Sequence, residues 1–142
     1  MVARCLSLPY QKMQIPIDQV LLVDDEPTNN FIHKILLEKS EFAKEIAQVE
    51  SGSEALEFLR NRVPDLILLD LNMPALSGWD FLDRFERYIS NNVKPCIVIL
   101  SSSLDPKDHE KANLNSDVTA FLTKPLKVEN LLEAITKKKR NS

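Results

Sequence analysis

Hydrophobic and polar positions follow a repeating order along the chain, in which short apolar runs alternate with amphipathic segments. The runs at residues 19–23, 65–69 and 94–100 contain few polar positions, as is typical of parallel strands that are buried on both faces. A weaker strand candidate lies at residues 45–49, and a further run lies at 118–123. The pattern therefore predicts five strands.

The first predicted helix follows Pro27, because proline suits the first turn of a helix. Its apolar residues recur at helical spacing and predict a buried face made of Phe31, Ile32, Ile35 and Leu36. His33 falls on the opposite face, and no cysteine or second histidine stands near it in the sequence. We therefore expect a surface histidine there and not a metal ligand.

Further helices are predicted after Ser51, Ser77 and Asp105, three residue types that cap helix N-termini. A last helix carries apolar residues at spacings of three, four and seven, from Val128 to Ile135. The helix at 105–115 has little apolar surface, so we expect it to have low local stability. We hypothesise that this helix, the strand at 118–123 and the last helix form the output surface.

Five strands that alternate with five helices predict right-handed crossovers and a parallel sheet covered on both faces. The expected fold is an α/β three-layer sandwich, doubly wound and flavodoxin-like. Residues 1–17 show no sustained period and are expected to form an N-terminal extension, with one domain at residues 18–142.

Composition and net charge limit the classes of protein to which the chain can belong. The chain has 142 residues, 44% of them hydrophobic, and a formal net charge of −3, which fits one globular domain and argues against direct binding of nucleic acid. Two cysteines, Cys5 and Cys96, indicate reduced thiols and hence a cytoplasmic protein. The apolar runs are far shorter than the ~20 residues of a membrane-spanning helix, so no membrane association is expected.

Polar residues that can bind a ligand or take part in a reaction stand directly after the apolar runs. These are Asp24, Asp25, Asp70, Ser101 and Lys124. Because ligands bind at the carboxyl ends of the strands in an open parallel sheet, we expect the five side chains to meet at one edge. Each of them alone is more often a turn former, a cap or a surface residue, and only their combination indicates a site.

Oxygen ligands without histidine or cysteine favour a hard cation, and Mg²⁺ fits better than zinc. A cation beside a lysine and a hydroxyl can neutralise the oxygens of a phosphoryl group. An aspartate can then attack phosphorus and carry the group. Asp70 is the best candidate, since it follows a strongly apolar strand and precedes a polar loop.

Four stretches of the chain resemble the receiver domain of two-component response regulators, such as the chemotaxis response regulator. They read VLLVDDEP, PDLILLDLNMPALSGWDFL, CIVILSSS and AFLTKPL, and the resemblance extends from about residue 19 to residue 139. It implies that Asp70 accepts a phosphoryl group from a histidine kinase or a phosphotransfer protein. It also implies direct Mg²⁺ ligation by Asp25, Asp70 and the backbone carbonyl of Asn72, with Asp24 acting through a water.

The same resemblance assigns Ser101 and Lys124 to the phosphoryl oxygens and makes the Lys124–Pro125 peptide bond cis. Phe121 matches the position of an aromatic switch, although it also fits a plain core residue. Only Asn141 and Ser142 follow the terminal basic run. This predicts a stand-alone regulator that signals by binding an unknown downstream protein or acts as an intermediate carrier.

Two other functions fit part of this pattern. A Mg²⁺-dependent phosphatase with an aspartyl-phosphate intermediate, similar to the haloacid dehalogenase group, needs an aspartate two residues after the nucleophile, where Asn72 stands. A flavin or nucleotide binder needs a glycine-rich phosphate loop, and the chain has only two glycines, Gly52 and Gly78. We therefore expect no enzyme activity beyond self-catalysed phosphorylation and dephosphorylation.

Overall fold

The computed structural model describes residues 17–89 and 93–140. Its strands are β1 (Gln19–Val23), β2 (Glu45–Val49), β3 (Leu66–Leu69), β4 (Cys96–Ser101) and β5 (Val118–Thr123). Its helices are α1 (Pro27–Lys39), α2 (Gly52–Asn61), α3 (Gly78–Arg84), the 3₁₀ helix η2 (Phe85–Tyr88), α4 (Pro106–Leu114) and α5 (Val128–Arg140). The strands form one parallel sheet in the order β2-β1-β3-β4-β5.

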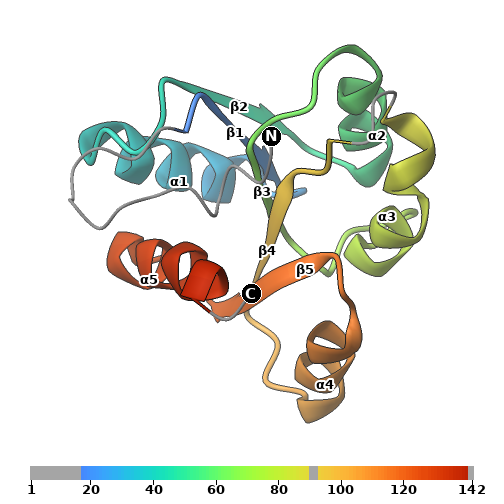
Figure 1. Cartoon of the computed structure of the whole chain (residues 1–142). Helices are drawn as coiled ribbons and strands as arrows, with labels where there is room; N and C mark the ends of the chain where they lie inside the picture. Colours follow the sequence, from blue (N-terminus) through green and yellow to red (C-terminus); the bar gives the residue numbers. More distant parts are fainter. Residues whose placement is uncertain (1–16, 90–92, 141–142) are drawn as a thin grey trace.

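Helices cover both faces of this sheet. In Figure 1, α1 and α5 lie on one side of the strands, and α2, α3 and α4 lie on the other. Successive strand residues enter opposite cores: Leu21 and Val23 of β1 pack on the α2–α3 side, while Val20 and Leu22 pack on the α1–α5 side. The predicted α/β three-layer sandwich is thus confirmed, and the continuous apolar runs reflect burial on both faces.

The strands begin close to their predicted positions, and a buried carboxylate connects the starts of β1 and β3. Asp65 precedes β3, and its Oδ2 accepts hydrogen bonds from the backbone N–H groups of Asp18 and Gln19 at 2.6 and 3.1 Å. This ties the start of β3 to the start of β1. The edge strand β2 is only half-buried, which explains its weaker apolar pattern.

Three of the predicted helix caps form. Ser51 Oγ accepts from the Glu54 N–H at 3.0 Å, and Asp105 Oδ1 accepts from the Lys107 N–H at 2.9 Å. Ser77 and Asp80 form a reciprocal capping box, with two bonds of 3.1 Å. Each bond satisfies a backbone donor that the helix itself leaves unpaired.

The predicted face of α1 is wrong. Phe31 and Ile32 are 59% and 49% exposed, and the buried residues of the helix are Asn30, His33 and Leu37. Asn30 is the physical reason, because its Nδ2 donates to the backbone oxygens of Asp24 and Val49, both at 3.0 Å. These bonds fix the rotation of α1 about its axis and turn His33 inward.

The helix α4 has the sparse anchoring that its sequence predicts. Ala112 is its one buried residue, and Leu114 is 78% exposed. Its low local stability and its part in an output surface stay predictions. At the other end of the chain, residues 1–16 of the predicted extension lie outside the described residues, and Ile17 is buried.

Candidate functional site

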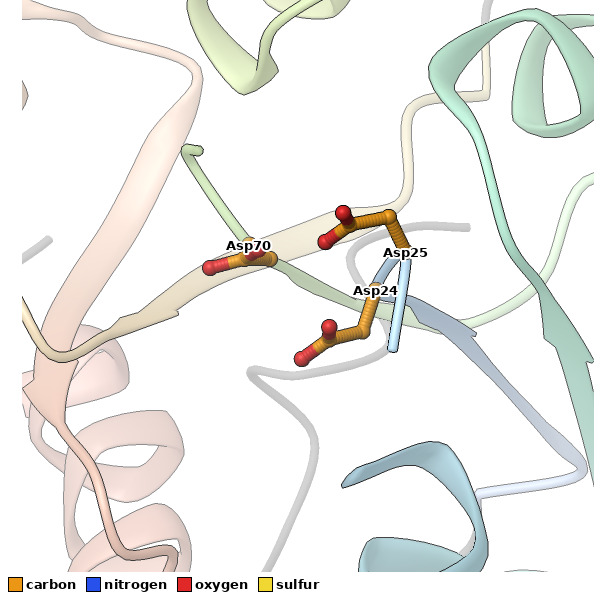
Figure 2. Close-up of side chains that lie close together, drawn as sticks. All are labelled: Asp24, Asp25 and Asp70. Carbon is orange, nitrogen blue, oxygen red and sulfur yellow. The ribbon is translucent and has the colours of Figure 1, made fainter. Parts of the chain in front are cut away.

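The carboxyl ends of β1 and β3 bring three aspartates together. Asp24 and Asp25 follow β1, and Asp70 follows β3, its neighbour in the sheet. Figure 2 shows their three carboxyl groups pointing to the same side. Each contributes one oxygen to a group in which all oxygens lie within 4.8 Å of one another. Asp24 and Asp70 are buried, and Asp25 is partly exposed.

Lys124 reaches the same cluster from the end of β5. Its Nζ donates to Asp24 Oδ2 at 2.9 Å and lies 3.5 Å from Asp70 Oδ1. The Lys124–Pro125 peptide bond is cis, as the resemblance implies. One ammonium therefore faces three carboxyl groups, and negative charge remains in excess when all three are ionised.

The electrostatics of the cluster favour a proton or a cation at Asp70. Burial raises the pKa of Asp70 to about 6, the charges of Asp24 and Asp25 contribute to the increase, and Lys124 opposes it. Burial also acts to lower the pKa of Lys124, but its hydrogen bond to Asp24 and the negative charge of Asp70 outweigh burial and raise it. Lys124 is therefore charged at neutral pH, while Asp70 ionises only close to neutrality.

The donor set fits a hard divalent cation. Three carboxylates whose oxygens lie within 4.8 Å of one another supply oxygen ligands only, as Mg²⁺ prefers. A divalent ion would also offset the excess negative charge that raises the pKa of Asp70. Asn72 lies exposed in the loop after β3, two residues beyond Asp70, and its carbonyl as a further ligand stays a prediction.

Ser101 ends β4 and is fully buried beside this edge of the sheet. Its Oγ accepts from the Ser103 N–H at 3.1 Å, and Ser103 Oγ donates to Asp108 Oδ2 at 2.6 Å. The backbone N–H of Lys124 donates to the Ser101 carbonyl at 2.9 Å. Ser101 is thus joined to α4 by hydrogen bonds through Ser103, a connection that the sequence analysis missed.

Phe121 lies in β5, partly buried, with its ring 3.9 Å from the ring of His109 on α4, centroid to centroid. Phe121 also packs against the core on the α2–α3 side of the sheet. Its role as a switch stays a prediction.

His33 and Asn30 are the residues near the site that sequence reasoning did not find. His33 is 7% exposed, and its pKa is lowered by burial and by the charge of Lys124, with Asp24 opposing. The signal was present in the sequence, since Asn30, His33 and Leu37 recur at spacings of three and four. It was masked by the more apolar stripe beside it.

No helix formed by the described residues has the length and apolar character to cross a membrane. Outside the acid cluster, Cys96 is buried and its Sγ lies 3.1 Å from Thr119 Oγ1, while Cys5 lies outside the described residues. The reduced state of both thiols stays a prediction.

Comparison with known proteins gives a consistent result. The family model of the response regulator receiver domain matches residues 20–136. The chain is 34% identical to a two-component response regulator from Cytophaga hutchinsonii, whose crystal structure superposes with a TM-score of 0.77 and coverage of 89% of this chain and 99% of that one. It is 29% identical to chemotaxis protein CheY of Halobacterium salinarum over 119 residues, covering 83% of this chain and 93% of that protein.

A longer relative matches this chain over only one part of its own length. The chain is 35% identical to protein-glutamate methylesterase/protein-glutamine glutaminase 3 of Burkholderia thailandensis over 109 residues, which make up 75% of this chain and 29% of that protein. The chain therefore spans less than a third of this relative's length.

Proposed function

The chain belongs to the response regulator receiver domain family, and on this premise we propose that it accepts a phosphoryl group on Asp70 and signals through a phosphorylation-dependent change of its binding surface. The observation that supports this most strongly is the meeting of Asp24, Asp25, Asp70 and Lys124 at one edge of the sheet. We assign residues 18–142 to the receiver domain.

Asp70 acts as the nucleophile. A carboxylate oxygen forms a bond to phosphorus, while the bond from phosphorus to the donor's imidazole nitrogen breaks and its electron pair stays on the imidazole. The reaction needs the ionised carboxylate, and a pKa of about 6 leaves Asp70 mostly ionised at neutral pH. Asp70 is 7% exposed, and its carboxyl group points to the same side as those of Asp24 and Asp25 (Figure 2), so the incoming phosphoryl group approaches it from that side.

The other residues stabilise the transferred group. Lys124 Nζ, now shared between Asp24 and Asp70, pairs with a phosphoryl oxygen, and the Ser101 hydroxyl donates to another. Asp25, Asp70 and the backbone carbonyl of Asn72 would hold Mg²⁺, with Asp24 acting through a water. The bound ion would supply neutralisation of the phosphoryl oxygens.

The phosphodonor is a histidine kinase or a phosphotransfer protein. The exposed apolar residues of α1, Phe31, Ile32 and Ile35, begin six residues after Asp25 and offer a docking surface close to the acid cluster. Exposed apolar side chains in one group are typical of a protein interface. The downstream partner binds on α4, β5 and α5, where Ser103 and Asp108 connect Ser101 to α4.

The proposed reactions are limited to transfer of the phosphoryl group to and from Asp70. Asn72 stands where a phosphatase of the alternative kind needs a general acid, so we propose self-catalysed phosphorylation and dephosphorylation only, without turnover of phosphate esters. The cytoplasmic location remains a prediction from cysteine usage.

Intact-mass measurement after incubation with acetyl phosphate and Mg²⁺ tests the proposal. The wild type should gain one phosphoryl group, and Asp70→Asn should gain none. Asp83→Asn, an exposed position of α3, is the matched control and should behave as the wild type. An equal adduct on Asp70→Asn, or turnover of p-nitrophenyl phosphate that depends on Asp70, would overturn it.

A further inference from the structure

A small, partly open cavity lies beside the acid cluster, between the N-terminal half of α1 and the sheet. The volume open to the centre of a water molecule is about 10 Å³, which is close to the space that one water needs. Its polar lining residues are Asp24, Asn30, His33 and Asp70, and its apolar lining residues are Leu22, Val23, Leu68 and Leu100. The cavity thus joins the buried side of α1 to the two buried aspartates.

Asn30 lines this cavity and carries an unsatisfied acceptor. Its side chain is fully buried, and both bonds of its Nδ2 go to backbone oxygens, those of Asp24 and Val49. These bonds fix which end of the amide is the donor. The Oδ1 is the one buried side-chain polar atom without a hydrogen-bond partner in the part of the chain that the structure describes, and leaving such an acceptor unpaired is costly.

His33 supplies the complementary chemistry. Burial and Lys124 lower its pKa, so the ring is neutral at pH 7 and has one donor and one acceptor nitrogen. No hydrogen bond joins the ring to another residue within ranges 17–89 and 93–140. A water between His33 and Asn30 satisfies both, because it can donate to Asn30 Oδ1 while it hydrogen-bonds the ring.

We propose that one buried water occupies this cavity, donates a hydrogen bond to Asn30 Oδ1 and bonds the His33 ring, and that Asn30 and His33 are thereby positioning residues of the acid cluster. The water accepts from a ring N–H of His33, and its second hydrogen is donated in a third bond to a carboxylate oxygen of Asp24 or Asp70, the acidic residues of the lining. The space is too small for a metal ion that keeps part of its water shell, and the apolar half of the lining supplies no ligands for a bare ion.

The positioning role follows from the connection between α1 and the aspartates. Asn30 holds the backbone of Asp24 directly, and the water extends this support to a side chain of the cluster. Loss of the water's partners should therefore loosen the carboxylates that bind a divalent cation. This second half of the proposal rests on the proposed function, whereas the water itself does not.

Two measurements test the proposal. A crystal structure at about 1.5 Å resolution should show one ordered water within hydrogen-bond distance of Asn30 Oδ1 and the His33 ring. Calorimetric titration with Mg²⁺ should then show that His33→Leu, which is apolar and of similar size, binds the ion about 3- to 10-fold more weakly than the wild type. His33→Gln keeps a donor and an acceptor and should bind within about twofold of the wild type.

Urea unfolding of both variants verifies that they are folded before titration. An empty cavity in the crystal structure would overturn the water, and wild-type Mg²⁺ affinity in His33→Leu would overturn the positioning role. Equal weakening in His33→Leu and His33→Gln would also overturn it, since the loss would then come from packing. Failure of Asp70 to accept phosphate would overturn the proposed function but would leave the crystallographic result unchanged.

Discussion

Replacement of Asp70 by asparagine should stabilise the metal-free protein at neutral pH. In the folded protein the pKa of this carboxyl lies at about 6 instead of 3.8, chiefly because the group is buried and close to Asp24. The folded state therefore holds the proton more tightly than the unfolded state does. As pH rises from about 4 to about 6, ionisation of Asp70 lowers the free energy of unfolding.

The size of the effect follows from the pKa difference. A difference of about two pKa units at about 1.4 kcal/mol each amounts to about 3 kcal/mol at pH 7 and above. Asparagine resembles the protonated carboxyl in shape and carries no charge, so Asp70→Asn should recover most of this energy. The opposing contribution of Lys124 is already contained in the pKa.

Urea unfolding followed by circular dichroism in EDTA, at pH 4 and pH 7.5, measures the difference. We expect Asp70→Asn to exceed the wild type by about 2–3 kcal/mol at pH 7.5 and to match it closely at pH 4. Asp83→Asn at an exposed site of α3 is the control for the substitution itself. The reasoning is refuted if the gain is the same at both pH values, or if Asp70→Asn is less stable than the wild type at pH 7.5.

Four further outcomes are expected. Mg²⁺ at about 100 times its dissociation constant should raise the free energy of unfolding by about 3 kcal/mol. In a thermal melt this gain should appear as a higher melting temperature, which EDTA should lower again. Lys124→Met removes a charge that lowers the pKa of Asp70, so carbon-13 NMR of the carboxyl should show a pKa above 6. Gly78→Ala should cost about 1–3 kcal/mol in urea unfolding, because its Cβ would lie 2.6 Å from the backbone oxygen of Asp70. Ser103→Ala removes the 2.6 Å bond to Asp108, so hydrogen exchange of the first turn of α4 should become about 3- to 10-fold faster.

Much of the fold was predictable because burial on both faces of the sheet makes the sequence of a parallel strand continuously apolar. Residues 66–69 are all apolar and all buried, and the residue that follows them must emerge at the carboxyl edge. The grouping of Asp24, Asp25 and Asp70 follows from this rule and from the order of the strands. The acid cluster was therefore accessible from sequence alone.

The orientation of α1 was not accessible in this way. Hydrophobic periodicity assumes that the most apolar stripe is buried, but two tertiary hydrogen bonds of Asn30 set the rotation of this helix. The bonds bury polar residues, Asn30 and His33, and leave Phe31 and Ile32 exposed.

We expect the three carboxylates that the fold gathers at Asp70 to form one divalent-cation site. Anomalous diffraction from crystals soaked in Mn²⁺, which shares the oxygen-ligand preference of Mg²⁺, tests it directly. We expect a single strong peak within bonding distance of Asp25 and Asp70, about 2.0–2.3 Å from their oxygens, and its loss in Asp70→Asn crystals. Absence of a peak at the cluster in fully soaked wild-type crystals would contradict the claim.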